Sequence, residues 1–253
     1  MKREKLYIST TAEDDVSLAE RYGLGLEIAE FCTAFNMDIY LNEYMPIVQA
    51  KLQRAERFTF HAAFNELCPA AIEPLVLEVT EKRYNQALDL ASQLGIKKIV
   101  VHSGFVPLIY YKSWFTQRSI EFWRKLLGSR TETDITVCLE NVIEDEPEML
   151  TEIVREVDDS RFRLCLDVGH ANCQSKLPIS EWVNCMKPYL CHVHLHNNLG
   201  ERDTHDTLDK GSVPMEEVIR LIERFCPKAS FTIENMRAEA SLDWLITSGI
   251  LEG

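Results

Sequence analysis

The stretch RLCLDVGH, residues 163–170, places a strand-like apolar run directly before an acidic residue, Asp167. Side chains alternate faces along a strand, so Leu166 and Asp167 point in opposite directions. Five further stretches repeat this pattern near their carboxyl ends: RFTFHA (57–62), KIVVHSG (98–104), TVCLENV (136–142), CHVHLHN (191–197) and FTIENM (231–236). The potential metal ligands in the six stretches are His61, His102, Glu140, Asp167, His194 and Glu234.

Polar side chains at the carboxyl ends of successive strands are typical of an eight-stranded α/β barrel. The hydrophobic pattern predicts eight strands, over residues 5–10, 24–31, 57–64, 96–104, 135–142, 161–170, 190–197 and 230–235. Helices are predicted between and after them, over residues 12–23, 42–53, 81–95, 114–128, 146–157, 178–189, 214–225 and 241–251. Strict alternation of this kind indicates parallel strands joined by crossover helices. We therefore predict a single (β/α)8 TIM barrel.

A second layer of side chains favours closure into a barrel over an open sheet. The residues two positions before each ligand are mostly small, as a filled barrel interior requires: Thr59, Val100, Cys138, Cys165, His192 and Thr232. An open doubly wound sheet is the alternative, and it would be expected to carry a Gly-rich phosphate-binding turn after an early strand. The sequence contains no such turn.

Length and composition are those of one α/β domain. The 253 residues, 46% of them hydrophobic, contain no linker or low-complexity tract, so residues 1–253 are predicted to form one domain. No apolar run approaches the ~18 residues of a membrane span, and MKREKLYIST lacks the apolar region of a signal peptide. The eight cysteines form no CxxC pair and are expected to be reduced thiols of a cytoplasmic protein, not a zinc ribbon.

The charge distribution argues against a nucleic-acid partner. The formal net charge is −13, and residues 30–50 and 58–81, which include the loops after the second and third strands, contain no Lys or Arg. A barrel that grips duplex DNA at this face needs cations there. We expect the partner to be a small molecule. The sequence also allows the chain to form a homo-oligomer.

Three more candidate ligands follow the strand ends: His170 in the run DVGH, and Asp203 and His205 in the run DTH. The nine residues together are five His, two Asp and two Glu. This donor set suits zinc, manganese, iron or cobalt, and nine donors exceed the need of one tetrahedral ion. We predict a site for one to three divalent ions, zinc or manganese. His196 is expected to contact ligands or substrate, and His192 to lie in the interior.

The runs LENV, LDVGHAN, HVHLHNN, DTHDTLDKG and TIEN resemble the xylose isomerase-like barrels, which include sugar isomerases, sugar epimerases and endonuclease IV. The resemblance extends over nearly the whole chain. In the isomerase and epimerase branch it implies one divalent ion held by Glu140, Asp167, His194 and Glu234. In endonuclease IV it implies a trinuclear zinc centre with further ligands, and the matching residues here are His61, His102, His170, Asp203 and His205.

Two departures from the family pattern lie after the seventh strand. The family often has Gly-Glu-Gly after the loop histidine, where this chain has Asp209-Lys210-Gly211. It also often has His-x-Asn-Asp or His-Asp-Asn, where this chain has His196-Asn197-Asn198. The first departure leaves the shape of the loop open, and the second removes a carboxylate that would be expected to contact a ligand.

Two reactions would use the predicted site differently. In isomerisation or epimerisation of a small sugar or sugar phosphate, Glu140 and Glu234 would move a proton beside the carbonyl while also binding metal. The alternative is hydrolysis of a phosphoester, either abasic-site DNA or a small phosphoester, and His61, His102, Asp203 and His205 would then be essential. Substrate contacts are expected from His196, Lys210 and Arg237. Dehydratase or aldolase chemistry, or a purely structural metal, are further alternatives.

Overall fold

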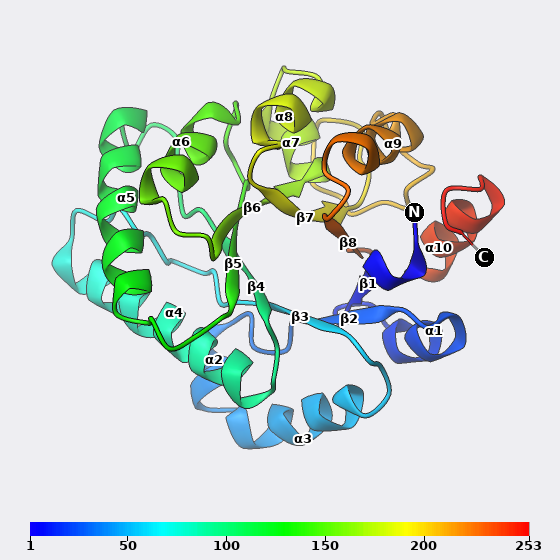
Figure 1. The fold of residues 1–253 in the computed structure, drawn as a ribbon, viewed down its shortest axis with the longest axis horizontal. Coiled ribbons are helices and arrows are strands. Elements are labelled where there is room, and N and C mark those ends of the chain that lie inside the picture. Colours follow the sequence, from blue (N-terminus) through cyan, green and yellow to red (C-terminus); the bar gives the residue numbers. More distant parts are fainter. Residues whose placement is uncertain (253) are drawn as a thin grey trace.

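The computed structural model describes residues 1–252, which form a barrel of eight strands surrounded by helices (Figure 1). A short 3₁₀ turn, η1 (Arg3–Lys5), precedes the first strand. The strands are β1 (Leu6–Ser9), β2 (Gly25–Ile28), β3 (Phe58–His61), β4 (Lys98–His102), β5 (Thr136–Glu140), β6 (Phe162–Asp167), β7 (Leu190–Leu195) and β8 (Ser230–Ile233). All eight predicted strands are present, each shorter than its predicted range.

The helices form the outer ring. They are α1 (Asp15–Tyr22), α2 (Ala34–Asp38), α3 (Leu41–Leu52), α4 (Pro74–Gln93), α5 (Lys112–Gly128), α6 (Glu148–Val157), α7 (Val168–Gln174), α8 (Ile179–Met186), α9 (Met215–Phe225) and α10 (Glu239–Thr247). α9 explains how this ring forms, because its residues Met215, Val218, Ile219 and Ile222 recur at helical spacing and are buried. Burying each such side chain contributes about 1.5–3 kcal/mol.

Strand pairing closes the barrel. Every strand pairs in parallel with the next, and β1 also pairs in parallel with β8, where Leu6 lies opposite Phe231. The predicted TIM barrel is therefore confirmed, and the open doubly wound sheet is excluded. The two ends of the described chain meet beside this seam (Figure 1), where the Glu252 N–H donates to the Met1 carbonyl at 2.9 Å.

Two helices were not predicted, and two boundaries differ from the prediction by three residues or more in ways that bear on the site or its surroundings. α7 begins directly after Asp167, so the predicted strand over residues 161–170 ends three residues early and His170 lies on a helix. α2 is a single short turn capped by Thr33. α4 begins at Pro74 instead of residue 81 because Glu73 caps it and Pro at its first position needs no N–H partner.

The barrel interior below the ligands is filled, as predicted. Val100, Cys138 and Cys165 are fully buried and form one small cluster, against which Cys191 packs. All eight cysteines are free thiols, and the sulfur atoms of Cys138 and Cys191 lie 3.1 Å apart. The filled interior closes the barrel from within, so any ligand must enter from the carboxyl ends of the strands.

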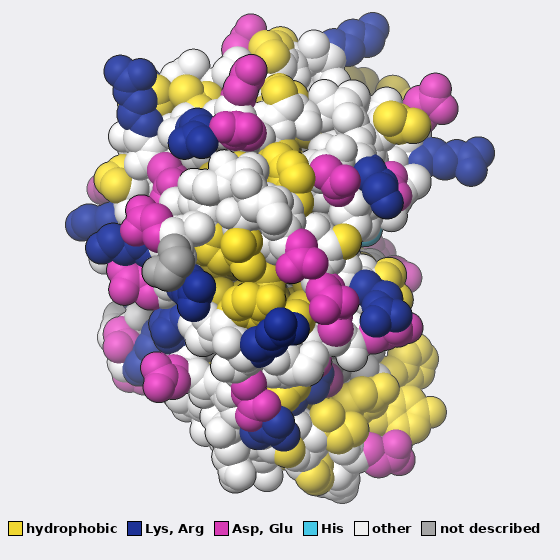
Figure 2. Space-filling model, turned by 90° about the vertical axis from the view of Figure 1, so that its right-hand side faces the viewer, with side chains coloured by type: hydrophobic (Ala, Val, Ile, Leu, Met, Phe, Trp, Pro, Cys, Tyr) yellow, Lys and Arg dark blue, Asp and Glu magenta, His cyan; other side chains and the backbone are white. Residues whose placement is uncertain are grey.

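The surface carries mixed charge. Figure 2 shows the face beside the chain ends, where Lys and Arg side chains are interspersed with Asp and Glu over the part that the structure describes. Hydrophobic side chains gather at its lower right, on the side where Figure 1 places α2 and α3. Among residues 1–252, none of the helices is both long enough and apolar enough to cross a membrane.

Candidate metal centre

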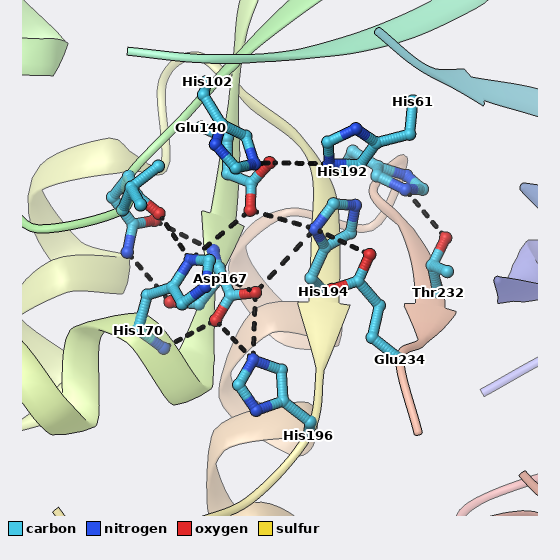
Figure 3. A network of polar contacts seen from close by, with 12 residues as sticks. His61, His102, Glu140, Asp167, His170, His192, His194, His196, Thr232 and Glu234 are labelled. Atoms are coloured by element: carbon cyan, nitrogen blue, oxygen red, sulfur yellow. Dashed lines mark hydrogen bonds and ion pairs between the residues drawn. The ribbon is translucent and has the colours of Figure 1, made fainter. Parts of the chain in front are cut away.

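Seven of the nine predicted ligands line one cavity of about 390 Å³ at the mouth of the barrel, and the other two, Asp167 and His194, contact residues that line it. Figure 3 shows the ligands at the strand ends together with His170. His61, His102, Glu140 and Asp167 are the last residues of β3 to β6. His194 is the penultimate residue of β7, and Glu234 follows β8 directly. The residues that line the cavity are Ser9, Thr11, Ala29, Cys32, His61, Phe64, His102, Glu140, Val142, His170, Asp203, His205 and Glu234.

Glu140 lies at the centre of the ligand set. Its Oε2 lies 3.5 Å from the Nε2 atoms of both His61 and His102, and its Oε1 lies 3.1 Å from Nδ1 of His194. The side chain of Glu140 is only 1% exposed, and Oε2 has no hydrogen-bond partner among residues 1–252. An unpartnered carboxylate oxygen is costly to bury, so this arrangement fits a cation between the three side chains.

His194 faces the other carboxylates with the same ring nitrogen. Nδ1 lies 3.4 Å from Oε1 of Glu234 and 3.8 Å from Oδ2 of Asp167, in addition to its contact with Glu140. These four residues come from β5, β6 and β7 and from the end of β8, as predicted. Glu140 could bridge two ions, one bound with His194 through Oε1 and one bound with His61 and His102 through Oε2.

A second group of ligands comes from helix α7, which carries His170, and from the loop after β7, which carries Asp203 and His205. Oδ2 of Asp203 is 3.3 Å from Nε2 of His170 and 3.1 Å from Nε2 of His205. His196 lies beside this group: its ring stacks on His205 at 3.8 Å between centroids, and its Nε2 lies 3.0 Å from Oδ1 of Asp167. The predicted contact of His196 with ligand residues is therefore present, whereas its contact with substrate stays a prediction.

Local structure fixes His170 in this group. The Asp167 side chain caps α7 by accepting a hydrogen bond from the His170 N–H at 2.6 Å, so one residue serves as both cap and candidate ligand. Gly169, between them, is required by close packing, because a Cβ there would lie 1.9 Å from the His196 ring. The run DVGH is thus a strand end, a helix start and part of the site.

The loop that carries Asp203 and His205 is held by two asparagines. The Asn235 amide donates to the carbonyls of His205 and Asp206, at 2.9 and 2.8 Å. Asn197 pairs with Asp206 in a backbone bridge, and its side chain bonds the 208–213 turn. Gly211 in that turn packs against Asn197, where a Cβ would collide with the amide. The departures from the family pattern therefore still give an anchored loop.

Three of the histidines share one orientation. In each, Nδ1 lies against a backbone carbonyl: His61 against Ala62 at 3.0 Å, His170 against Asn141 at 3.0 Å and His205 against Glu234 at 2.8 Å. A carbonyl only accepts, so Nδ1 carries the proton and Nε2 is free to bind a cation. Hydrogen bonds of this kind are usual behind metal-ligating histidines.

The electrostatics of the site keep most of its carboxylates charged. Burial alone would raise the pKa of Glu140, but the charge of His194 and the hydrogen bonds of His194 and His61 outweigh it and hold the pKa well below its usual value. Burial also raises the pKa of Asp167, but the charges of His170 and His196 outweigh this effect, and the pKa falls to about 2. Glu234 differs, because burial prevails and its pKa is raised. Burial also lowers the pKa of His102 to about 3, which keeps the ring neutral, as a ligand must be.

Two predicted substrate contacts lie apart from the cavity. Lys210 and Arg237 are both exposed, and neither lines it. Among residues 1–252, no Lys or Arg lines the cavity at all. The walls are instead His and carboxylate side chains with the ring of Phe64, which stacks on His102 at 4.3 Å between centroids. The role of Lys210 and Arg237 toward substrate stays a prediction.

One buried carboxylate was missed. Glu27 on β2 is fully buried inside the barrel, and one of its oxygens lies 3.0 Å from Nε2 of His194. The sequence pattern could have revealed Glu27, because Leu24, Leu26 and Ile28 alternate with it and its side chain must therefore point inward. With Glu27 included, all seven histidines of the chain lie in the site or against it.

Fold and site together define a TIM barrel with a histidine and carboxylate site at the carboxyl ends of its strands. Residues 23–247 match the model of the xylose isomerase-like TIM barrel family, and the chain belongs to this family.

Two curated relatives show how far the sequence likeness extends. The uncharacterized protein MJ1311 of Methanocaldococcus jannaschii is 27% identical over 186 residues, which are 69% of this chain and 63% of that protein. A probable endonuclease 4 of Metamycoplasma arthritidis is 26% identical over 151 residues, 52% of this chain and 53% of that protein. The matched stretches span less than two thirds of either relative.

Solved structures resemble the whole barrel. A D-tagatose 3-epimerase-like protein superposes with a TM-score of 0.80 at 22% identity, covering 97% of this chain and 96% of that one. The TTHB071 protein of Thermus thermophilus, soaked with ZnCl₂, superposes with a TM-score of 0.75 at 21% identity, covering 99% and 100%. At such identities the likeness establishes the fold.

Proposed function

We propose that this protein is a divalent-metal-dependent enzyme that isomerises or epimerises a small sugar. The observation that carries the proposal is the pair Glu140 and Glu234, whose carboxylates lie 3.1 and 3.4 Å from the same nitrogen of His194 and line one open cavity. A sugar placed there would have a carboxylate on each side of the metal site. The D-tagatose 3-epimerase-like neighbour is consistent with this class of substrate.

The side chains would divide the work as follows. A divalent ion, when bound by Glu140, Asp167, His194 and Glu234, would polarise neighbouring sugar oxygens. One glutamate removes the proton from the carbon beside the carbonyl, and the other returns a proton at its new position.

The cavity lining favours an uncharged sugar over a sugar phosphate. Recognition of a phosphate by the protein alone normally uses Arg or Lys, and among residues 1–252 none lines this cavity. Phe64 instead offers an apolar ring of the kind that can pack against the C–H face of a sugar. A phosphorylated substrate would need additional metal ions to hold its phosphate.

Phosphoester hydrolysis is the second candidate, and the loop group of ligands favours it. His170, Asp203 and His205 converge on one point, and His61 and His102 converge with Glu140 on another. Two or three ions at such points could hold the attacking and leaving oxygens of a phosphoester. The probable endonuclease 4 among the relatives belongs with this alternative. The low density of cations near the mouth argues for a small phosphoester over duplex DNA.

One combined experiment separates the two candidates. The protein, purified without chelators, is analysed for bound metal and then incubated in D₂O with a panel of ketoses and aldoses. We expect about one tightly bound ion, with a new epimer or isomer detected by NMR, and no turnover by the variant Glu234→Gln. Two or three zinc ions, hydrolysis of bis(p-nitrophenyl) phosphate and no change in any sugar would refute isomerisation or epimerisation.

A further inference from the structure

Glu27 lies one layer deeper in the barrel than the candidate ligands. It is in register with Thr59 of β3, two residues before His61, and its exposure is 0%. A carboxylate at this depth is costly unless its oxygens are hydrogen-bonded. Its partners therefore indicate what the charge is for.

One oxygen of Glu27 is saturated by donors. Oε2 accepts from the hydroxyls of Thr59 at 2.8 Å and Thr232 at 3.0 Å, and it lies 2.9 Å from Nε2 of His192. Each donor comes from a different strand, so the carboxylate links β2 to β3, β7 and β8. The two hydroxyls donate to this oxygen, and His192 is a third donor when its proton is on Nε2, so the surroundings favour an ionised Glu27.

The other oxygen of Glu27 has one neighbour. Oε1 lies 3.0 Å from Nε2 of His194 in an ion-pair contact, and neither atom makes a hydrogen bond to any other group among residues 1–252. A charged carboxylate can only accept, so this contact requires the proton of His194 on Nε2. Nδ1 faces Glu140 and Glu234, at 3.1 and 3.4 Å, so without metal it carries a proton as well, and a bound ion would take the place of that proton.

A chain of donors behind Glu27 balances its charge. The ammonium of Lys98 donates to the Ser230 hydroxyl at 2.7 Å, and Ser230 lies 2.6 Å from Nδ1 of His192. Nε2 of His192 in turn lies 2.9 Å from Glu27, and Figure 3 shows His192 beside His194 and Thr232. Every donor in this chain points toward Glu27, from the lower end of the barrel to its middle. The chain supports a fixed negative charge beneath His194.

His194 thus differs from the other histidines of the site. His61, His170 and His205 each place Nδ1 against a neutral backbone carbonyl and direct Nε2 at the carboxylates. His194 is reversed: it places Nε2 against an ionised carboxylate and directs Nδ1 at the site. A charged acceptor makes the stronger hydrogen bond and increases the basicity of the opposite nitrogen.

We propose that Glu27 is a positioning residue of the metal centre, which holds His194 with Nε2–H inward and presents Nδ1 to the ion. The inference rests on the proposed function only in requiring that an ion binds at His194. It assigns the chain Lys98, Ser230 and His192 to the support of Glu27. Neither Glu27 nor this chain touches the substrate.

The first test is zinc affinity, measured by competition with a chromogenic chelator. Glu27→Gln should weaken the tightest zinc site about 10- to 100-fold, the usual effect of removing such a partner of a ligand. Thr59→Val is the graded comparison, because it removes one of the donors to Glu27 without touching His194, and it should weaken zinc binding less than Glu27→Gln does. Equal zinc affinity in wild type and Glu27→Gln would overturn the proposal.

The second test reads His194 directly by ¹H–¹⁵N NMR of the imidazole groups, with assignment by the signal lost in His194→Asn. Nε2 should carry a downfield proton in metal-free and zinc-loaded wild type alike, and Glu27→Gln should shift or abolish that signal. A wild-type Nε2 without a proton would overturn the proposal even if Glu27→Gln does not fold. A wild-type protein that binds no zinc but keeps the signal would refute the metal centre and still support the orientation of His194.

Discussion

The two groups of candidate ligands are built differently. Glu140, Asp167 and His194 lie on strands, and their side chains are at most 1% exposed. Asp203 and His205 lie on a loop, and their side chains are 34% and 33% exposed. Strands in a closed barrel are fixed by their neighbours, whereas a loop is fixed by a few hydrogen bonds, here those of Asn197 and Asn235. We expect the strand group to bind metal first and the loop group to bind it more weakly.

The largest effect is expected at the residue that joins the groups. Glu140 contacts His61, His102, His194 and, at 3.5 Å, Nδ1 of His170. Glu140→Gln removes a charge that ions at His194 and at the pair His61 and His102 would share, so turnover should fall by roughly 10²- to 10⁴-fold, the size of a metal's contribution to catalysis. Steady-state kinetics measure the loss of turnover, and metal analysis measures the expected loss of bound metal. Unchanged metal content in Glu140→Gln would contradict the central position of this residue.

Removing the loop group should have a smaller and more selective effect. In the double variant Asp203→Asn with His205→Gln, the weakest zinc equivalent should be lost and the tight one retained, because the strand ligands are unchanged. Sugar turnover should then stay within roughly tenfold of wild type, since acid–base catalysis rests on the glutamates. Calorimetric titration with zinc gives the stoichiometry. Loss of the tight equivalent instead would show that the two groups bind metal as one unit.

The pH dependence of the metal-free protein gives a third test. Burial lowers the pKa of His205, but the hydrogen bond with Asp203 and the charge of Glu234 outweigh it and raise the pKa from 6.5 to about 9. The protonated histidine therefore stabilises the fold below about pH 6.5, and this contribution is lost as pH rises through about 9. Thermal melts of metal-free wild type should lose more stability over this range than those of His205→Gln. The same slope in both proteins would contradict the shift.

The smallest effect is expected from the two predicted substrate contacts outside the cavity. Lys210 and Arg237 are exposed, so any attraction they exert on a substrate is screened by water and salt. Lys210→Ala and Arg237→Ala should each change KM by no more than about threefold and leave kcat unchanged. Initial-rate kinetics at two salt concentrations measure this. A tenfold rise in KM for either variant would indicate that this side chain contacts the substrate, and a phosphorylated sugar would again be a candidate substrate.

Much of this protein could be predicted from its sequence alone. Alternation along each strand separates the outward Leu164 and Leu166 from the inward Asp167, and this pattern predicts both the barrel and the ligand at its mouth. The nine candidate ligands lie around one site for the same reason, since parallel strands bring their carboxyl ends together. Local pattern is sufficient wherever the position of a residue on its own strand decides where its side chain points.

Other features depended on contacts between distant segments. Glu27 and His194 are separated by most of the barrel in sequence, so no local pattern pairs them, yet closure places their atoms 3.0 Å apart. The orientation of each histidine ring, and the exposure of Lys210 outside the cavity, likewise follow from packing and loop geometry. The sequence by itself determined the fold and the inventory of ligands. Only the tertiary structure decided how they are grouped and held, because hydrogen bonds across a closed barrel are not periodic in sequence.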